Sequence, residues 1–459
     1  MRLTFTRLAL LAAIVALFAP ALAAAKATPA EITSTRTKGV EYLKGLQKTS
    51  GEIPGFGGDW ALTAFAAAGI APADVNRGGG ESSDARSWYE SVVGPVTWPG
   101  AEPLATDYER ATLLSYAAGT DPARVSKRQN LIAGIASYYQ PASPGYYGST
   151  FNGTVFGLLA LAGAKTTGGA ARMPAVVLNQ AVAAVEANQH TDGGWTWEKA
   201  AGNPPALESA SEPDMTGAAM AALCGAGVSG GAAPIVAAQA YLASVLDSST
   251  GAFETAFGVN TDSTAWAVAG LKACGIDPQA SEFTTGTSKT PLTYLISQQL
   301  SKGGGFKYST GTTADEYASQ DAVRALGSGG FTATPPKPAK GPQWKGVSEF
   351  ATGATETTSL ALIVDDGAAA LRICSVSLAP KATTTTLATV LAAAVAATTP
   401  AECVTGFLPG SGEGAITQVN GYPAVPAERW KLSIDGAALA TAKRSTAIHV
   451  GDTLYLKYE

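Results

Sequence analysis

Two different periods of hydrophobic residues divide this chain. Up to residue 331, apolar residues recur at helical spacing in alanine-rich segments such as 177–189 and 214–225. After residue 345, short apolar runs end at Asp-Gly or Gly-Asp turns and read as strands, at 360–364, 371–378, 430–434 and 453–457, with one helix over 386–397. A Pro-rich stretch, 332–344, lies between and predicts an extended linker. The pattern therefore predicts a multidomain protein, in which an all-α part precedes a small α+β, β-rich domain at 345–459.

The helical part contains a repeat. An aromatic residue, usually preceded by Gly, follows a helix-like segment at intervals of about fifty residues, at Phe56, Trp98, Tyr146, Trp195, Phe253 and Phe306. Residues 214–223 align with 262–271, and both segments keep an acid, a threonine two places later and a leucine nine places later. Because the second helices are rich in Ala and Gly and carry little charge, we expect them to pack closely as an inner ring. Residues 35–331 are therefore predicted to form an (α/α)6 toroid of six helical hairpins.

Residues 1–24 have the composition of an export signal peptide. Arg2 and Arg7 precede the apolar run 8–18, and small residues follow it. This run is shorter than the roughly 20 residues that span a bilayer. We therefore expect cleavage, and a mature chain that is secreted to the extracellular space and has no membrane span.

Charge and cysteine content narrow the possible partners and compartment. The formal net charge is −5, and no run of Lys or Arg supplies the basic face that a nucleic-acid backbone requires, so we expect no nucleic-acid partner. The sequence has four cysteines, which allow three pairings. Their locality favours Cys224 with Cys274 and Cys374 with Cys403, with free buried thiols as the alternative. Export would permit both disulfides.

Polar residues stand where the predicted inner helices begin. Helix capping explains each of them individually, because an Asp or Asn at a helix start accepts hydrogen bonds from unpaired backbone amides. In a closed toroid, however, these helix starts share one rim and face a ligand together, while aromatic residues in the connecting loops present flat apolar area. The candidate ligand-binding residues are Asp107, Asn152, Asp214, Asp262, Trp197, Tyr308 and Trp430, the last at the start of a predicted strand.

Two sets of motifs resemble known families. The Gln and Gly-aromatic turns at 47–56, 189–195 and 299–306 resemble those of the prenyltransferase and terpenoid-cyclase type of α/α toroid. Residues 415–421, 430–436 and 448–458 are similar to the small C-terminal domain of the transcobalamin and intrinsic factor type. This resemblance implies a secreted protein that holds cobalamin between toroid and small domain. By the same analogy the small domain also occurs in bacterial surface proteins with other ligands.

The motifs that would indicate the chemistry of related toroids are missing from the sequence. It contains no Asp-x-Asp-Asp cluster of alkene-protonating cyclases and no Cys-Gly-Glu-Gln thioester, and His190 is the single histidine available for a zinc set in the toroid. We therefore expect no metal and favour a non-catalytic protein that binds a small molecule, with a corrinoid among the candidates. One alternative is an extracellular polysaccharide-active enzyme that uses two rim carboxylates. Another is an adhesion module that contacts a cell-surface protein.

Overall fold

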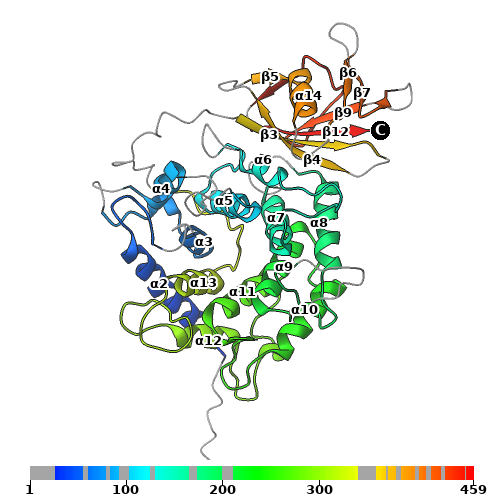
Figure 1. Cartoon of the computed structure of the whole chain (residues 1–459). Coiled ribbons are helices and arrows are strands. Elements are labelled where there is room, and N and C mark those ends of the chain that lie inside the picture. The colour runs from blue at the N-terminus through cyan, green and yellow to red at the C-terminus, as the bar shows by residue number, and fades with distance from the viewer. Residues whose placement is uncertain are drawn as a thin grey trace, which may run out of the picture.

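The computed structural model describes residues 26–54, 60–78, 83–92, 103–124, 130–164, 173–198, 210–339, 358–367, 371–378, 384–397, 403–409, 415–424, 430–449 and 451–459. The predicted signal peptide, Phe56, Trp98 and the end of the predicted linker, 340–344, lie outside the described residues. Within them, a helix-rich part is followed by a β-rich C-terminal part, as predicted (Figure 1). None of the described helices is long and apolar enough to cross a bilayer.

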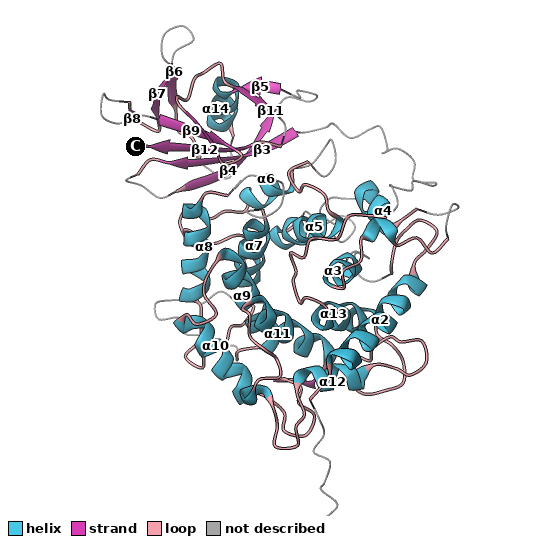
Figure 2. Cartoon of the chain, turned by 180° about the vertical axis from the view of Figure 1, so that it is seen from behind, coloured by secondary structure: helices cyan, strands magenta, loops and turns pink. Residues whose placement is uncertain are grey.

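The helices of the first part alternate between two layers (Figures 1 and 2). The outer layer comprises α2 (Pro29–Leu46), α4 (Ala85–Val92), α6 (Leu131–Ala136), α8 (Ala175–Ala187), α10 (Ala233–Ser244) and α12 (Pro291–Gln298). The inner layer comprises α3 (Trp60–Ala67), α5 (Ala105–Ala118), α7 (Phe151–Gly163), α9 (Pro213–Ala226), α11 (Thr261–Ala273) and α13 (Glu316–Leu326). Connections contain η1 (Pro72–Asp74), η3 (Ser281–Phe283) and the hairpin β1 (Glu254–Thr255) and β2 (Gly258–Val259). Each described inner helix contacts the next, and α13 contacts α3, so the inner layer closes into a ring.

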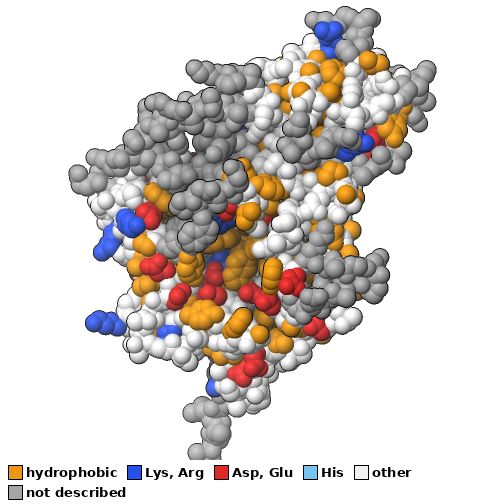
Figure 3. All heavy atoms as spheres, in the orientation of Figure 1, with side chains coloured by type: hydrophobic (Ala, Val, Ile, Leu, Met, Phe, Trp, Pro, Cys, Tyr) orange, Lys and Arg blue, Asp and Glu red, His pale blue; other side chains and the backbone are white. Residues whose placement is uncertain are grey.

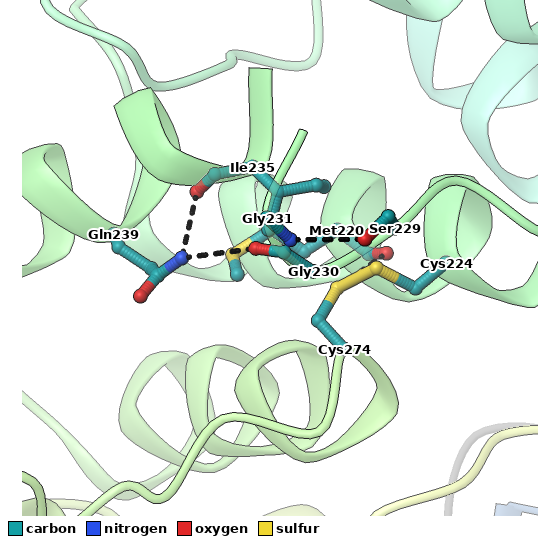
Figure 4. Close-up of a disulfide and its surroundings, with 8 residues drawn as sticks. All are labelled: Met220, Cys224, Ser229, Gly230, Gly231, Ile235, Gln239 and Cys274. Atoms are coloured by element: carbon teal, nitrogen blue, oxygen red, sulfur yellow. Dashed lines mark hydrogen bonds between the residues drawn. A yellow bond between two sulfur atoms is a disulfide. The ribbon is translucent and has the colours of Figure 1, made fainter. Parts of the chain in front are cut away.

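Small residues allow the inner helices to approach one another. A Cβ atom at Gly270 of α11 would lie only 2.3 Å from the carbonyl oxygen of Gly217 in α9, so this crossing requires glycine. A disulfide joins Cys224 and Cys274 at the C-terminal ends of the same two helices, which is the predicted pairing (Figure 4). The Ala- and Gly-rich composition thus produces the close inner packing expected from the sequence.

Three of the recurring aromatic residues, Trp195, Phe253 and Phe306, lie at junctions between helices and are fully buried. Their backbone N–H groups donate to hydroxyls of the following inner helix, from Trp195 to Thr216 (3.1 Å), from Phe253 to Thr264 (3.3 Å) and from Phe306 to Ser319 (2.9 Å). In the third unit Tyr147, rather than the predicted Tyr146, takes this position and donates to Thr154 over 3.2 Å. The threonine that recurs in the sequence is therefore the acceptor of the turn.

The glutamine that precedes these turns connects neighbouring units. The Nε2 atom of Gln189 donates to the carbonyl of Gly193 within its own turn and to that of Pro234 in α10, over 2.8 and 2.7 Å. Gln299 repeats the arrangement, but its second acceptor is Thr35 of α2, at 2.8 Å. This bond ties the last helical unit to the first and so helps to close the ring.

The C-terminal part is built on a sheet of order β10-β9-β12-β3-β4, in which β12 and β3 run parallel. Its strands are β3 (Thr358–Asp365), β4 (Arg372–Leu378), β9 (Trp430–Ile434), β10 (Ala437–Leu439) and β12 (Thr453–Tyr458). Around it lie β5 (Thr384–Thr386), α14 (Leu387–Ala396), β6 (Phe407–Pro409), β7 (Ile416–Val419), β8 (Tyr422–Pro423) and β11 (Ala447–His449). The second predicted disulfide, Cys374 with Cys403, lies in its core.

The small domain lies at the outer edge of the ring, beside α6 (Figures 1 and 2). Apolar residues of β3 and β4, including Ile363 and Ile373, belong to the same buried cluster as the helical core. The hydroxyl of Tyr139 donates to the carbonyl of Leu371 over 2.9 Å. Arg124 adds ion pairs to two aspartates of the small domain, at 3.0 and 3.2 Å. Direct contacts between side chains therefore join the two parts.

The chain that follows α13 crosses the middle of the ring (Figure 1). Phe331 is 2% exposed, and the described part of the predicted linker then runs along the C-terminal ends of inner helices. A Cβ atom at Gly119, directly after α5, would lie 3.3 Å from Pro335, and the N–H of Ala339 donates to Asp74 over 2.9 Å. Residues 332–339 thus pack against the helical part.

Candidate functional site

A cavity of about 350 Å³ lies at the centre of the helical ring. Figure 3 shows acidic and apolar side chains gathered around the hollow there. Its wall combines aromatic rings and carboxylates from several inner helices, among them Trp60 (α3), Phe156 (α7), Asp214 (α9), Asp262 and Trp266 (α11) and Asp321 (α13). A concave site with apolar walls and a few polar groups is the usual form of a small-molecule site.

Asp262 reaches the cavity because another residue caps its helix. The side chain of Asn260 accepts the hydrogen bond from the N–H of Ser263, at 2.8 Å, and is the N-cap of α11. The capping explanation therefore does not apply to Asp262. Its Oδ1 atom is buried and has no hydrogen-bond partner among the described residues. Such an unpaired buried oxygen is a place where a ligand can bind.

Neighbouring charges act strongly on this carboxyl group. Burial, and then the charges of Asp321 and Asp315, raise the pKa of Asp262 to about 8, against the opposing effect of Arg324. Burial likewise raises the pKa of Asp214. Burial also raises the pKa of Asp321, and the nearby Arg324 counteracts this effect. At neutral pH Asp262 is therefore mainly protonated, whereas an ordinary aspartic acid would be ionised.

Arg324 is a fully buried cation beside the cavity. Its Nη2 atom donates to Asp321 over 2.6 Å, and the indole N–H of Trp266 donates to the other oxygen of the same carboxylate over 2.9 Å. The guanidinium lies 4.8 Å from the ring centre of Trp266, 4.1 Å from that of Phe331 and 5.8 Å from that of Trp60. Aromatic faces attract cations, so these rings already hold one positive charge.

The structure brings two of the seven candidate residues, Asp214 and Asp262, into the cavity wall. Tyr308 lies next to the start of α11, because its carbonyl accepts the N–H of Thr261 at 2.7 Å. The residue is 45% exposed. The remaining four lie outside this wall. Trp197 is 46% exposed and accepts the N–H of Asn152, Asp107 accepts the N–H of Leu104 ahead of α5, and Trp430 is buried in the small domain.

Sequence reasoning did not single out Asp321 and Arg324. A sequence signal for them does exist, because they are the only two charged residues in the segment 318–326. Two opposite charges three residues apart in a buried helix indicate a paired site. Trp266 packs against the core and also lines the cavity. Among the described residues no group of His, Cys, Asp and Glu is arranged to hold a metal ion.

The sequence matches no protein-family model and no curated protein. Similar solved structures include the type II terpene cyclase MstE from Scytonema, at 13% identity over 65% of this chain and 98% of that one, with a TM-score of 0.45. Haptocorrin in complex with Cbi is 12% identical over 94% and 96% of the two chains, with a TM-score of 0.32. Protein geranylgeranyltransferase-I from Candida albicans, complexed with GGPP, is 12% identical over 49% and 66%, with a TM-score of 0.35. A terpene cyclase, a transcobalamin-type protein and a prenyltransferase are thus among its structural neighbours, as the resemblance predicted, at a similarity that carries no functional argument.

Proposed function

We propose that this protein is a secreted binding protein that captures a compact organic cation in the central cavity of an (α/α)6 toroid. The observation that carries the proposal is the excess of carboxylates at the cavity. Asp214, Asp262 and Asp321 line the cavity, and among the described residues Arg324 is the one cation that forms an ion pair with any of them, with Asp321. The signal-like N-terminus and the two disulfides support an exported protein.

The walls of the cavity suit a cation that carries apolar groups. Trp60, Phe156 and Trp266 line the cavity, and aromatic rings attract quaternary ammonium groups. The volume, about 350 Å³, lies at the lower end of ordinary ligand pockets, which begin at about 300 Å³. A small amine or quaternary ammonium compound therefore matches both the size and the charge of the cavity.

Binding of such a cation is linked to the proton on Asp262. A cation favours the ionised carboxylate, so below the pKa of about 8 the ligand must displace a proton. Affinity for a ligand that does not itself titrate then rises about tenfold per pH unit up to about pH 8 and is constant above it. Besides burial, the groups that act on the pKa of Asp262 are the charges of Asp321, Asp315 and Arg324 around α13 and of Asp214 on α9.

Calorimetric titration of the mature protein with choline, between pH 6 and 9, tests the proposal. The neutral isostere 3,3-dimethylbutan-1-ol is the matched ligand control, and Asp262→Asn is the matched variant. We expect choline to bind with the pH dependence above, the isostere to bind much more weakly, and the variant to lose the pH dependence. Equal binding of both ligands, or no binding of choline and of larger quaternary amines, would reject a cation site.

The resemblance to the transcobalamin type implies that a corrinoid would bind between the two domains. At the described contacts Tyr139 and Arg124 bridge the domains directly, which favours the central cavity over that junction. Gel filtration with cyanocobalamin distinguishes the two sites. If the corrinoid co-elutes with the protein at micromolar concentration, the junction replaces the cavity as the ligand site.

A second candidate, a polysaccharide-active enzyme, is favoured by the raised pKa of Asp262. A protonated acid close to a second carboxyl group is the arrangement that glycoside hydrolysis uses. Incubation with bacterial and plant polysaccharides, followed by measurement of reducing ends, tests this role. Activity that Asp262→Asn abolishes would establish it, and an untouched panel would exclude it.

A further inference from the structure

The segment that follows α13 returns into the ring. After Leu326 the chain turns at Gly327 and at Gly329, whose φ of 79° is accessible mainly to glycine. The N–H of Ser328 donates to the carbonyl of Ala67 at the end of α3, over 2.9 Å. These turns direct Phe331 toward the interior of the ring, where it is 2% exposed.

Phe331 lies directly behind two rings of the cavity wall. Its ring centre is 4.3 Å from that of Trp266, in a tilted stack, and 6.4 Å from that of Trp60. Both tryptophans line the cavity, and the guanidinium of Arg324 lies 4.1 Å above the Phe331 ring. Phe331 therefore packs behind these two tryptophans and is not itself part of the cavity wall.

The residues that follow span the base of the ring. A Cβ atom at Gly163, near the end of α7, would lie 3.0 Å from Thr332, and one at Gly119, after α5, would lie 3.3 Å from Pro335. A Cβ atom at Gly329 would lie 3.0 Å from Lys272 of α11. The segment therefore contacts the C-terminal ends of inner helices on several sides, and glycine leaves room for it to pass.

We propose that Phe331 supports the floor of the central cavity from behind, by holding Trp60 and Trp266 in place, and so sets the length of the ligand that the cavity accepts. The inference rests on the proposed function, because it assigns that ligand to this cavity. This support comes from the segment that leads to the small domain rather than from the inner ring itself. Without the ring of Phe331, the cavity extends toward the base of the toroid.

A homologous series of n-alkyltrimethylammonium ions, from ethyl to decyl, measures this depth by calorimetry on the full mature chain. In wild type, affinity is expected to rise with alkyl chain length up to a certain length and to rise no further beyond it. In Phe331→Ala, it should keep rising by about fourfold per added methylene beyond that point. Phe331→Leu should give an intermediate limit and serves if the alanine variant does not fold. An unchanged limit in the variants would overturn the proposal.

Phe283→Ala is the matched control, because Phe283 is fully buried and packs against Phe253, away from the cavity. This variant should keep the wild-type limit on alkyl chain length. A longer limit in Phe283→Ala would show that loss of any buried phenyl group loosens the helical toroid.

A second measurement is independent of the ligand class. Crystals of Phe331→Ala under xenon pressure should show a xenon atom in the space of the lost phenyl ring, next to Trp266, that wild-type crystals lack, because xenon enters empty apolar cavities. If no alkylammonium ion binds wild type, the cation proposal fails, and the xenon experiment alone tests the role of Phe331. The absence of that xenon site would refute it.

Discussion

Replacement of Asp262 by Asn should stabilise the protein at pH 8 and change its stability little at pH 4. Burial and the charges of Asp321 and Asp315 raise the pKa of Asp262 to about 8 in the folded protein. In the unfolded chain an aspartic acid titrates near 3.9. Between these two values the folded state holds a proton that the unfolded state releases, so the free energy of unfolding falls as the pH rises through this window.

The size of this fall follows from the pKa difference. Each pH unit corresponds to about 1.4 kcal/mol, so over about four units the loss is on the order of 5 kcal/mol at pH 8. Asparagine has the shape of the protonated group and cannot ionise. The variant should therefore lack this loss, and its advantage over wild type should grow from pH 4 to pH 8 and level off above.

Urea unfolding of the disulfide-intact mature chains, followed by tryptophan fluorescence at each pH, measures this difference. Titration of other groups occurs in both proteins and largely cancels when wild type is subtracted from the variant. Asp277→Asn, at an exposed position, is the control and should follow wild type at every pH. If the difference between Asp262→Asn and wild type is the same at pH 4 and pH 8, Asp262 ionises as an ordinary carboxyl and the electrostatic reasoning about the cavity is wrong.

Three further predictions concern the framework that positions the cavity. Thr264→Val leaves the buried N–H of Phe253 without its acceptor and should lower the free energy of unfolding by about 1–3 kcal/mol. Urea unfolding measures this loss, and Thr37→Val, at an exposed position, is the control. Joint replacement of Cys224 and Cys274 by Ala opens a bond between residues 50 positions apart and should cost about 4 kcal/mol; an unchanged melting temperature would contradict this. Arg124→Ala removes the ion pairs between the domains and should split a single calorimetric transition into two, and one undivided transition would show that apolar packing alone joins them.

Much of the helical framework could be predicted because its causes are local in sequence. The Ala- and Gly-rich composition of 214–225 predicts a closely packed helix, and the close approach at Gly217 is its physical basis. The repeated threonine, Thr216 and Thr264, marked corresponding positions before its role as acceptor of the turn amide was known. Closeness along the chain was enough to favour both disulfide pairings. The third turn was predicted one residue early because Tyr146 and Tyr147 are adjacent and only burial distinguishes them.

The cavity was predicted only in part, because it depends on directions that composition does not contain. Asp214 and Asp262 were recognised from their place at helix starts, but nothing in the periodicity indicates that Asn260 takes over the capping role. A shift of one residue turns a helical side chain by about 100°, so the pattern of polar residues does not tell which of them face the axis. Trp197 and Asn152 share the polar and aromatic signals of the true wall and yet lie outside it.

By itself the sequence predicted a helix-rich part followed by a β-rich part and favoured the two cysteine pairs that the structure shows, since these features follow from patterns along the chain. Only the tertiary structure decided that Trp60, Asp262 and Asp321 meet, because closure of the ring brings together α3, α11 and α13. It also decided that Phe331 is buried against Trp266, since the Pro-rich segment predicts an extended chain but not the surface on which that chain lies. Charges distant in sequence interact strongly here because they share one buried space, and burial is a property of the assembled ring.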